Sequence, residues 1–233
     1  EKMFSYLFNY IKNSESLRLK CLSVHIGSQI LDVKPYERML SVLDKLIKKT
    51  EYHFDYIDLG GGMGINYNND NINLNFKRYC SSIKKFIKKH PSIIIFEPGR
   101  SIIGNSGILI SKIIYIKEGY KKNFVILDAA MNDLIRPALY GAKHRIIPLK
   151  KNNLKSNKIY EFVGPICEST DKFLTQKKFQ KVSEKEFIII CDVGAYGMSL
   201  SSNYNLRPKA TELLIRNSKV QIISKRQKLK ELI

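Results

Sequence analysis

Amphipathic helical stretches alternate with short β-type runs over the first hundred residues of the chain. Apolar side chains recur at helical spacing in residues 3–12, 35–49 and 76–89, while residues 22–27, 56–59 and 93–96 have the apolar, β-branched character of strands. The β-type runs recur about every 35 residues, which is the length of a strand–helix unit in a parallel sheet. This pattern predicts three consecutive strand–helix units, either part of a barrel or part of an open doubly wound sheet.

The run at residues 93–96 (IIIF) is followed at once by polar residues. Four consecutive apolar residues predict a strand that is buried on both faces. Such a strand delivers Glu97 and Arg100 to its carboxyl end, where ligands bind in parallel α/β architectures. The other two predicted strands end in His25–Ser28 and in Gly60-Gly61-Gly62, so a parallel sheet brings all three segments together.

After residue 105 the pattern changes to short β-rich runs separated by turns that contain glycine, asparagine and proline. The runs lie at residues 107–116, 123–128, 159–163, 187–193 and 211–224, with a polar loop at 150–158 and a short helix predicted over the last ten residues. They are typical of an antiparallel β domain, either a barrel or a sandwich. We therefore expect two domains, residues 1–106 and residues 107–233.

The charge balance changes this prediction little. Lysine and arginine number 40 against 21 acidic residues, a net charge of +19. The basic residues are spread over predicted helices and loops without interleaved aromatic residues, so binding to nucleic acid is disfavoured. No apolar run approaches the roughly 20 residues that span a bilayer, and no signal peptide begins the chain, so we expect a cytoplasmic protein without membrane contact. The four cysteines lack the spacing of a zinc site or a redox pair, and no metal site is expected.

Several residues could carry chemistry, each with a plainer alternative. The glycines at 60–62 and the Ser28 hydroxyl suit a phosphate, although three glycines are equally typical of a tight turn. The spacings of dinucleotide-binding and P-loop motifs are not met, which favours a smaller phosphorylated cofactor. By itself His25 is more often a structural histidine, and Glu97 and Arg100 could form a simple ion pair.

The β-rich half carries three further polar clusters. Arg136, in an unusually polar stretch, has a guanidinium fork matched to a carboxylate. Cys167 and Glu168 place a thiol beside an acid on a glycine–proline turn, where proton transfer needs a reachable group. Tyr196 lies between small residues, and a packed turn tyrosine is its alternative.

Six motifs, taken together and in this order, resemble the diaminopimelate decarboxylases, which are pyridoxal-phosphate enzymes of the alanine-racemase-like barrel class. They cover nearly the whole chain: HIGSQI at 25–30, GGGMG at 60–64, EPGR at 97–100, DAAMNDLIRPALY at 128–140, GPICES at 164–169 and GAYGMSLSSNYN at 194–205. The first three are shared with related basic amino-acid decarboxylases, and the last three are more specific. The resemblance implies the C-terminal part of a (β/α)8 barrel followed by the β domain.

The resemblance also implies roles for these residues around pyridoxal phosphate. His25 would stack on the cofactor ring, and Glu97 would pair with its pyridine nitrogen. The phosphate would be held by residues from all three strand ends: Ser28, Gly60, Gly61, Gly62, Gly99 and Arg100. Substrate carboxylate would be bound by three residues: Arg100, Arg136 and Tyr140.

The remaining implied roles concern the second substrate end and the partner. Glu168 would bind the distal ammonium, Tyr196 would contact cofactor or substrate, and Cys167 would return a proton after carbon dioxide leaves. In the family Cys167 and Glu168 reach the site of the other subunit, so the resemblance implies a homodimer.

The sequence departs from the family in one major respect. The family's cofactor-bearing lysine lies well before the HIGSQI motif, and neither Lys2, Lys12 nor Lys20 has its context. We therefore expect this chain to be the C-terminal part of the enzyme, unable by itself to bond the cofactor or to close a barrel. Smaller departures are Ala130 and Thr170, which stand where glycine is usual or frequent.

The expected reaction is decarboxylation of meso-diaminopimelate to L-lysine, the last step of lysine synthesis. One alternative is a sibling decarboxylase acting on ornithine, arginine or carboxynorspermidine, against which Arg136 counts because its charge would lack a carboxylate partner. Another is a non-catalytic paralogue that binds and regulates an active partner.

Overall fold

Three short parallel strands form the centre of the first of two units in the computed structural model, which describes residues 2–67 and 72–233. The first unit contains the described residues up to 66 and residues 72–101, and the second contains Tyr67 and residues 102–233. The three strands pair in the order in which they occur, with Leu22, Ile57 and Ile94 side by side. They are β1 (Cys21–Ser23), β2 (Tyr56–Asp58) and β3 (Ile93–Ile95).

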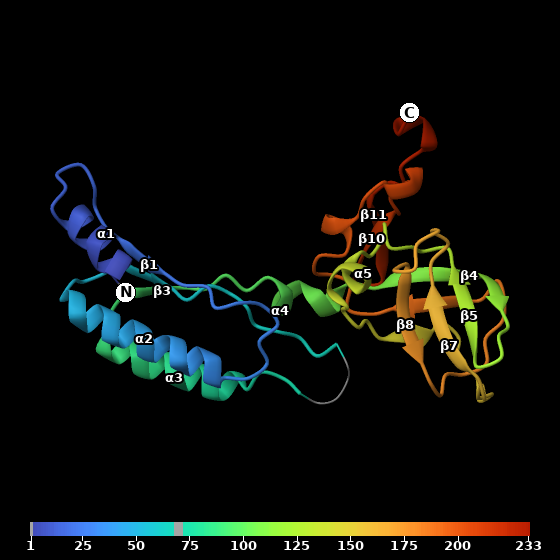
Figure 1. Cartoon of the computed structure of the whole chain (residues 1–233), viewed down its shortest axis with the longest axis horizontal. Helices are drawn as coiled ribbons and strands as arrows, with labels where there is room; N and C mark the ends of the chain where they lie inside the picture. The colour runs from blue at the N-terminus through green and yellow to red at the C-terminus, as the bar shows by residue number, and fades with distance from the viewer. Residues whose placement is uncertain (1, 68–71) are drawn as a thin grey trace. The chain divides into compact units, whose positions relative to one another are not determined.

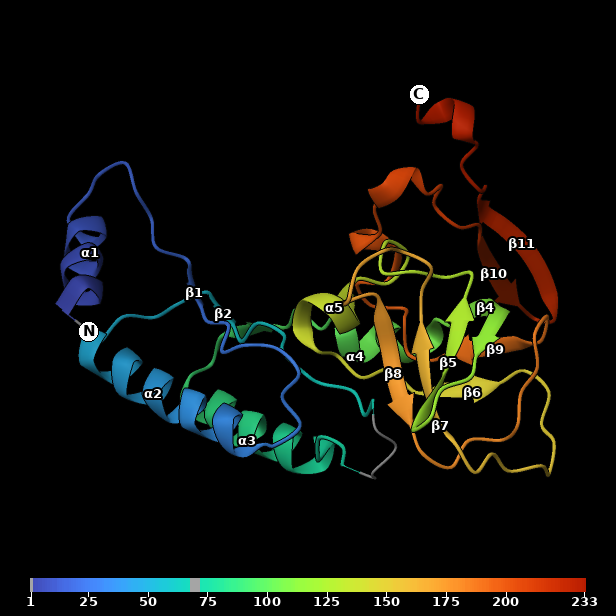
Figure 2. The same ribbon diagram turned by 45° about the vertical axis from the view of Figure 1, so that its right-hand side comes forward.

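Three helices accompany these strands: α1 (Lys2–Lys12), α2 (Lys34–Thr50) and α3 (Phe76–Lys89). Figures 1 and 2 show α2 and α3 side by side along the sheet. Pro35 lies in the first turn of α2, and the Asn75 side chain caps α3 by accepting a hydrogen bond from the Arg78 amide at 3.0 Å. The apolar stripes of both helices bury Leu43, Ile83 and the central strand residue Ile57. Two of the predicted parallel strand–helix units, β1–α2 and β2–α3, are therefore present, and β3 is the strand of the third.

The prediction that residues 93–96 are buried on both faces is wrong for this chain. Ile94 packs against the core, but Ile93 and Ile95 are 61% and 37% exposed. The reason is that β3 lies at the edge of a three-stranded sheet, one face of which packs against α2 and α3. Among the described residues nothing comparable covers the opposite face, so alternate side chains of β3 remain in solvent.

A curved sheet of six strands forms the core of the second unit (Figure 2). Their order is β6-β9-β4-β5-β7-β8. Their bounds are β4 (Leu109–Lys117), β5 (Lys122–Leu127), β6 (Ile146–Pro148), β7 (Ile159–Val163), β8 (Lys172–Gln176) and β9 (Phe187–Ile190). Buried side chains from these strands, including Ile113, Leu127, Phe162 and Ile188, form its apolar core.

The expectation of a purely antiparallel β domain is corrected by one strand pair. Phe124 of β5 pairs with Glu161 of β7 in parallel, whereas the other pairs of the sheet are antiparallel. The chain between β5 and β7 makes a long excursion through α5 (Arg136–Tyr140) and β6, so β7 starts from the same end of the sheet as β5. The sheet is therefore mixed.

The remaining elements are short. A separate antiparallel hairpin consists of β10 (Glu212–Arg216) and β11 (Lys219–Ser224), and the predicted terminal helix is only a single 3₁₀ turn, η4 (Leu229–Glu231). The others are α4 (Arg100–Ile103), η1 (Gly104–Ser106), η2 (Met198–Leu200) and η3 (Tyr204–Leu206). None of the helices in the described part of the chain has the length and apolar content needed to cross a bilayer.

Candidate functional site

The carboxyl ends of the three parallel strands meet at the Gly60-Gly61-Gly62 corner. A Cβ on Gly61 would lie 2.2 Å from the carbonyl oxygen of Glu97, and a Cβ on Gly60 would lie 2.5 Å from that of Val24. Gly60 and Gly62 also have positive φ angles of 64° and 86°. Glycine is therefore required for the backbones of the three strand ends to approach so closely.

Hydrogen bonds fix the residues around this corner. The Glu97 amide donates to the Gly60 carbonyl oxygen at 2.9 Å, and the Gly61 amide donates to Nδ1 of His25 at 3.3 Å. The Gly60 amide donates to the Asp58 carboxylate at 2.8 Å. Neutral His25 consequently carries its proton on Nε2, because Nδ1 is an acceptor. Since two of the three glycine amides are already engaged, an added anion would rely mainly on other donors.

Arg100 and Ser28 supply such donors beside the corner. The Arg100 guanidinium donates to the Ser28 hydroxyl oxygen at 3.1 Å, although the two residues are 72 positions apart in the chain. His25, Glu97 and Gly99 are exposed. The first unit thus brings together all of its predicted residues: a cationic and hydroxyl donor pair, an exposed imidazole and an exposed carboxylate.

Arg136 is the most unusual group of the second unit. It begins α5, and only 5% of its surface is exposed. Its Nη1 donates to Nε2 of His144 at 2.7 Å and to the Tyr67 hydroxyl at 3.1 Å. The guanidinium carbon also lies over the Tyr67 ring, 4.9 Å from the ring centroid. Within residues 2–67 and 72–233, no carboxylate forms an ion pair with Arg136. A buried guanidinium without a counter-ion is a strong receptor for a carboxylate.

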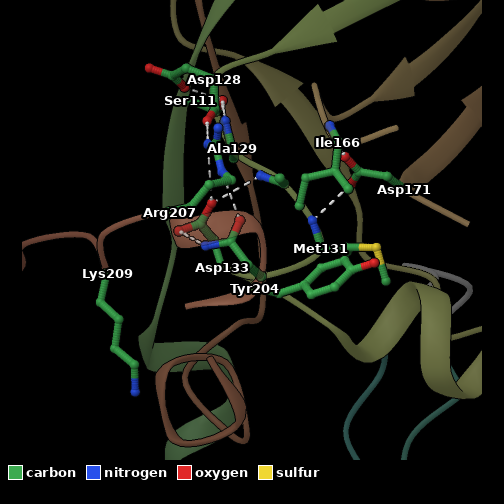
Figure 3. A network of polar contacts seen from close by, with 12 residues as sticks. Ser111, Asp128, Ala129, Met131, Asp133, Ile166, Asp171, Tyr204, Arg207 and Lys209 are labelled. Carbon is green, nitrogen blue, oxygen red and sulfur yellow. Dashed lines mark hydrogen bonds and ion pairs between the residues drawn. The ribbon is translucent and has the colours of Figure 1, made fainter. Parts of the chain in front are cut away.

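The turn that carries Cys167 and Glu168 is held by the buried carboxylate of Asp171 (Figure 3). This carboxylate accepts hydrogen bonds from the Ile166 amide at 2.8 Å and from the Met131 amide at 2.7 Å. Burial raises the pKa of Asp171, and the two amides oppose that rise. A Cβ on Gly164 would lie 2.2 Å from the same carboxylate, which explains this glycine. Asp171 therefore ties the Cys167–Glu168 turn to the loop that leads into Arg136.

A second cluster of polar side chains stabilises the loop that leads into Arg136. The Asp133 carboxylate accepts from the Ala130 amide at 2.9 Å and lies 3.9 Å from the Arg207 guanidinium (Figure 3). Arg207 also donates to the Asn132 side chain at 2.9 Å. Ala130 is fully buried and has no positive φ, so alanine is accommodated there; Thr170 has no positive φ either.

Glu168 accepts a hydrogen bond from the Tyr204 hydroxyl, and this bond raises the pKa of Tyr204. Cys167 is exposed on the same turn. Tyr140 and Tyr196 are 66% and 42% exposed.

Sequence reasoning assigned no role to several residues that organise the second unit. Four of them contact predicted site residues or their loops: His144, Tyr67, Asp171 and Tyr204. Tyr204 lies inside a recognised motif and was the easiest to find. His144 lies between Lys143 and Arg145, and Asp171 lies between Thr170 and Lys172, so neither is an isolated polar residue in the sequence and no local signal marks them. In the described residues, no cluster of histidine, cysteine and acidic side chains is suited to a metal ion.

The chain matches the model of the "Pyridoxal-dependent decarboxylase, C-terminal sheet domain" over residues 9–194. Among curated proteins it is 39% identical to the diaminopimelate decarboxylase of Aquifex aeolicus over 224 residues, covering 94% of this chain and 53% of that protein. The chain thus spans about half the length of the curated relatives it matches.

Two solved structures are similar over nearly the whole chain. The diaminopimelate decarboxylase of Helicobacter pylori complexed with L-lysine has a TM-score of 0.90 at 36% identity, covering 99% of this chain and 58% of that one. The enzyme of M. jannaschii in complex with L-lysine also has a TM-score of 0.90, at 31% identity, covering 98% and 54%. Because the family model matches well over half of the residues, the chain belongs to the pyridoxal-dependent decarboxylase family.

Proposed function

We propose that the protein containing this chain decarboxylates meso-diaminopimelate to L-lysine and carbon dioxide with pyridoxal phosphate. The observation that carries the proposal is the buried Arg136 guanidinium, which has no carboxylate partner among the described residues. A substrate carboxylate satisfies this charge. Diaminopimelate has a second carboxylate at the end of the molecule that is not decarboxylated. Ornithine and arginine have only the carboxylate that the reaction removes, so they offer no distal carboxylate to Arg136.

The residues of the first unit fit pyridoxal phosphate. Arg100 and Ser28 lie 3.1 Å apart and offer the cation and hydroxyl that a phosphate requires. The exposed His25 ring is fixed in orientation by the Gly61 amide, as a ring that stacks on the cofactor needs to be. When bound, the cofactor supplies an electron-withdrawing ring that accepts the electron pair left by carbon dioxide. The exposed Glu97 carboxylate would hold a proton on the pyridine nitrogen.

Each substrate-facing residue has a role that its chemistry supports. Arg136 binds the distal carboxylate, with Tyr140 and Arg100 as further carboxylate donors. Glu168 binds the distal ammonium, and the bond from Tyr204 fixes its orientation. Cys167 Sγ donates a proton to the carbon that has lost carbon dioxide, which its exposed position on a turn allows. Tyr196 contacts the cofactor or substrate.

The decisive experiment uses the complete gene product loaded with pyridoxal phosphate, and measures carbon dioxide release from several amino acids. We expect turnover of meso-diaminopimelate, with kcat/KM for ornithine and arginine lower by at least about 100-fold, because neither supplies a carboxylate to Arg136. Preference for ornithine or arginine would show a sibling decarboxylase. If the protein turns over none of these substrates but binds the active subunit of a related enzyme, it is a regulatory paralogue.

We also propose a homodimer that shares its active sites, with a cytoplasmic location as the expected setting. Large apolar side chains on the β10–β11 hairpin are exposed, namely Leu213, Ile215, Val220 and Ile222, at 55–70%. An exposed apolar surface of this kind supports burial against another chain. Cys167 and Glu168 are exposed and available to a second subunit.

Mixing two inactive variants of the complete protein tests the shared site. Glu97→Ala and Cys167→Ala are each expected to be almost inactive. If Cys167 serves the partner's Glu97-containing site, each mixed dimer contains one site with both residues. Refolding the two variants together should then restore about one quarter of wild-type activity, since half of the dimers are mixed and each has one intact site of two. Mixtures that remain as inactive as the single variants would exclude sharing.

A further inference from the structure

We infer that His144 is a positioning residue that keeps the Arg136 guanidinium oriented and uncompensated, and thereby sets the preference for a substrate with a distal carboxylate. The inference rests on the proposed function, which gives Arg136 its ligand. It concerns a histidine that contacts neither the cofactor residues of the first unit nor the Cys167 turn in any described hydrogen bond.

The hydrogen bonds of His144 determine which of its nitrogens carries the proton. Arginine only donates, so Nε2 of His144, 2.7 Å from Arg136 Nη1, must be the acceptor. Nδ1 then carries the hydrogen and donates to the Cys191 carbonyl oxygen at 2.9 Å. Protonation of the second nitrogen would set a donor against the Arg136 donor. His144 is therefore neutral in this arrangement.

Because His144 is buried, its neutral state affects the charge around Arg136. His144 is fully buried, and its ring packs edge-on against Tyr67 with centroids 5.1 Å apart. Tyr67 in turn lies against the guanidinium and accepts from it at 3.1 Å. Two neutral groups thus fix the plane of Arg136 without cancelling its charge. A carboxylate in place of either group would form an ion pair with Arg136 and compete with the substrate.

This difference gives a matched pair of variants, His144→Gln and His144→Glu. The two side chains have the same size and both offer an oxygen acceptor to Arg136, but only glutamate carries charge. In the complete, cofactor-loaded protein we expect His144→Gln to keep KM for meso-diaminopimelate within about threefold of wild type. His144→Glu should raise KM at least about tenfold above the glutamine variant, with kcat changed far less.

Product analogues separate charge recognition from general damage. L-lysine keeps the distal carboxylate and cadaverine lacks it. Inhibition by L-lysine should weaken in His144→Glu by the same factor as KM, while inhibition by cadaverine should stay within about twofold. Equal KM values for the two variants, or parallel shifts for the two inhibitors, would overturn the inference and leave His144 a structural residue.

Two further measurements keep the test decisive. If His144→Glu does not fold, Tyr67→Phe removes the other acceptor while keeping the ring, and we expect it to raise KM for meso-diaminopimelate by about threefold or more at unchanged kcat. The ¹⁵N spectrum of the wild-type imidazole should show a hydrogen on Nδ1 of His144 without any substrate; a hydrogen on Nε2 would refute the geometry. If that spectrum is as expected but Arg136→Ala leaves KM unchanged, the proposed function fails and the local geometry stands.

Discussion

Replacing Arg136 with alanine is expected to lower kcat/KM for meso-diaminopimelate by at least about 100-fold, mainly through KM. The guanidinium is buried, and no carboxylate of the described chain neutralises it. A substrate carboxylate at this position makes charge-assisted hydrogen bonds in a site with little competing water, where such bonds are strongest. Steady-state kinetics of the complete protein give KM and kcat separately.

Arg78 offers a matched control for the loss of an arginine. Its guanidinium is half exposed and forms an ion pair with Glu37 at 2.6 Å on the surface of the first unit. Exposed pairs of this kind contribute little, so Arg78→Ala should leave KM within about twofold of wild type. An unchanged KM in Arg136→Ala, with the control behaving as expected, would contradict the assignment of Arg136 to the distal carboxylate.

Replacing Gly61 with alanine is expected to weaken binding of pyridoxal phosphate by at least about tenfold and to lower activity accordingly. The new Cβ would lie 2.2 Å from the Glu97 carbonyl oxygen, and both partners are backbone, so neither can move without displacing a strand end. The same shift disturbs the amide that orients His25. A titration of the apoprotein, followed by cofactor absorbance, measures the dissociation constant.

Gly119 provides the control for Gly61. A Cβ on Gly119 would lie 2.4 Å from the Lys122 carbonyl oxygen, a comparable backbone collision in a turn of the second unit. Gly119→Ala should therefore destabilise the protein without changing its affinity for pyridoxal phosphate. The role of the corner would be refuted by a Gly61→Ala protein that binds the cofactor as tightly as Gly119→Ala does.

The regular part of the fold was predictable because its signals are local. The helical stripes over α2 and α3 and the spacing of the β-type runs predicted three parallel strands with α2 and α3 between them, which the structure confirms. β6 and β8 were missed because β6 (IIP) ends in a proline and β8 (KFLTQ) contains only two apolar residues between polar ones. The parallel pairing of β5 with β7 also escaped prediction, since it depends on where a long connection returns.

In the first unit, the larger error was the prediction that residues 93–96 are buried on both faces. A run of isoleucines is equally consistent with one or two covered faces, because composition does not report what lies opposite a strand. The convergence of the glycine corner with His25 and the backbone of Glu97, in contrast, followed from parallel pairing alone.

In the second unit the motifs identified Arg136, Cys167 and Glu168 as candidates but not the residues that support them. Asp171 and His144 each make one hydrogen bond to a group distant in the sequence, at separations of 40 and 47 residues for Met131 and Cys191. Such partners depend on tertiary packing, and no spacing rule encodes them. The roles of the candidates themselves remain predictions until the variants are measured.

The most direct test is the position of L-lysine in a crystal of the complete protein loaded with pyridoxal phosphate. We predict that the lysine carboxylate lies about 3 Å from the guanidinium nitrogens of Arg136, with His144 still accepting from the same side chain. A lysine carboxylate bound elsewhere, with Arg136 neutralised by a protein carboxylate, would contradict the proposed recognition of diaminopimelate.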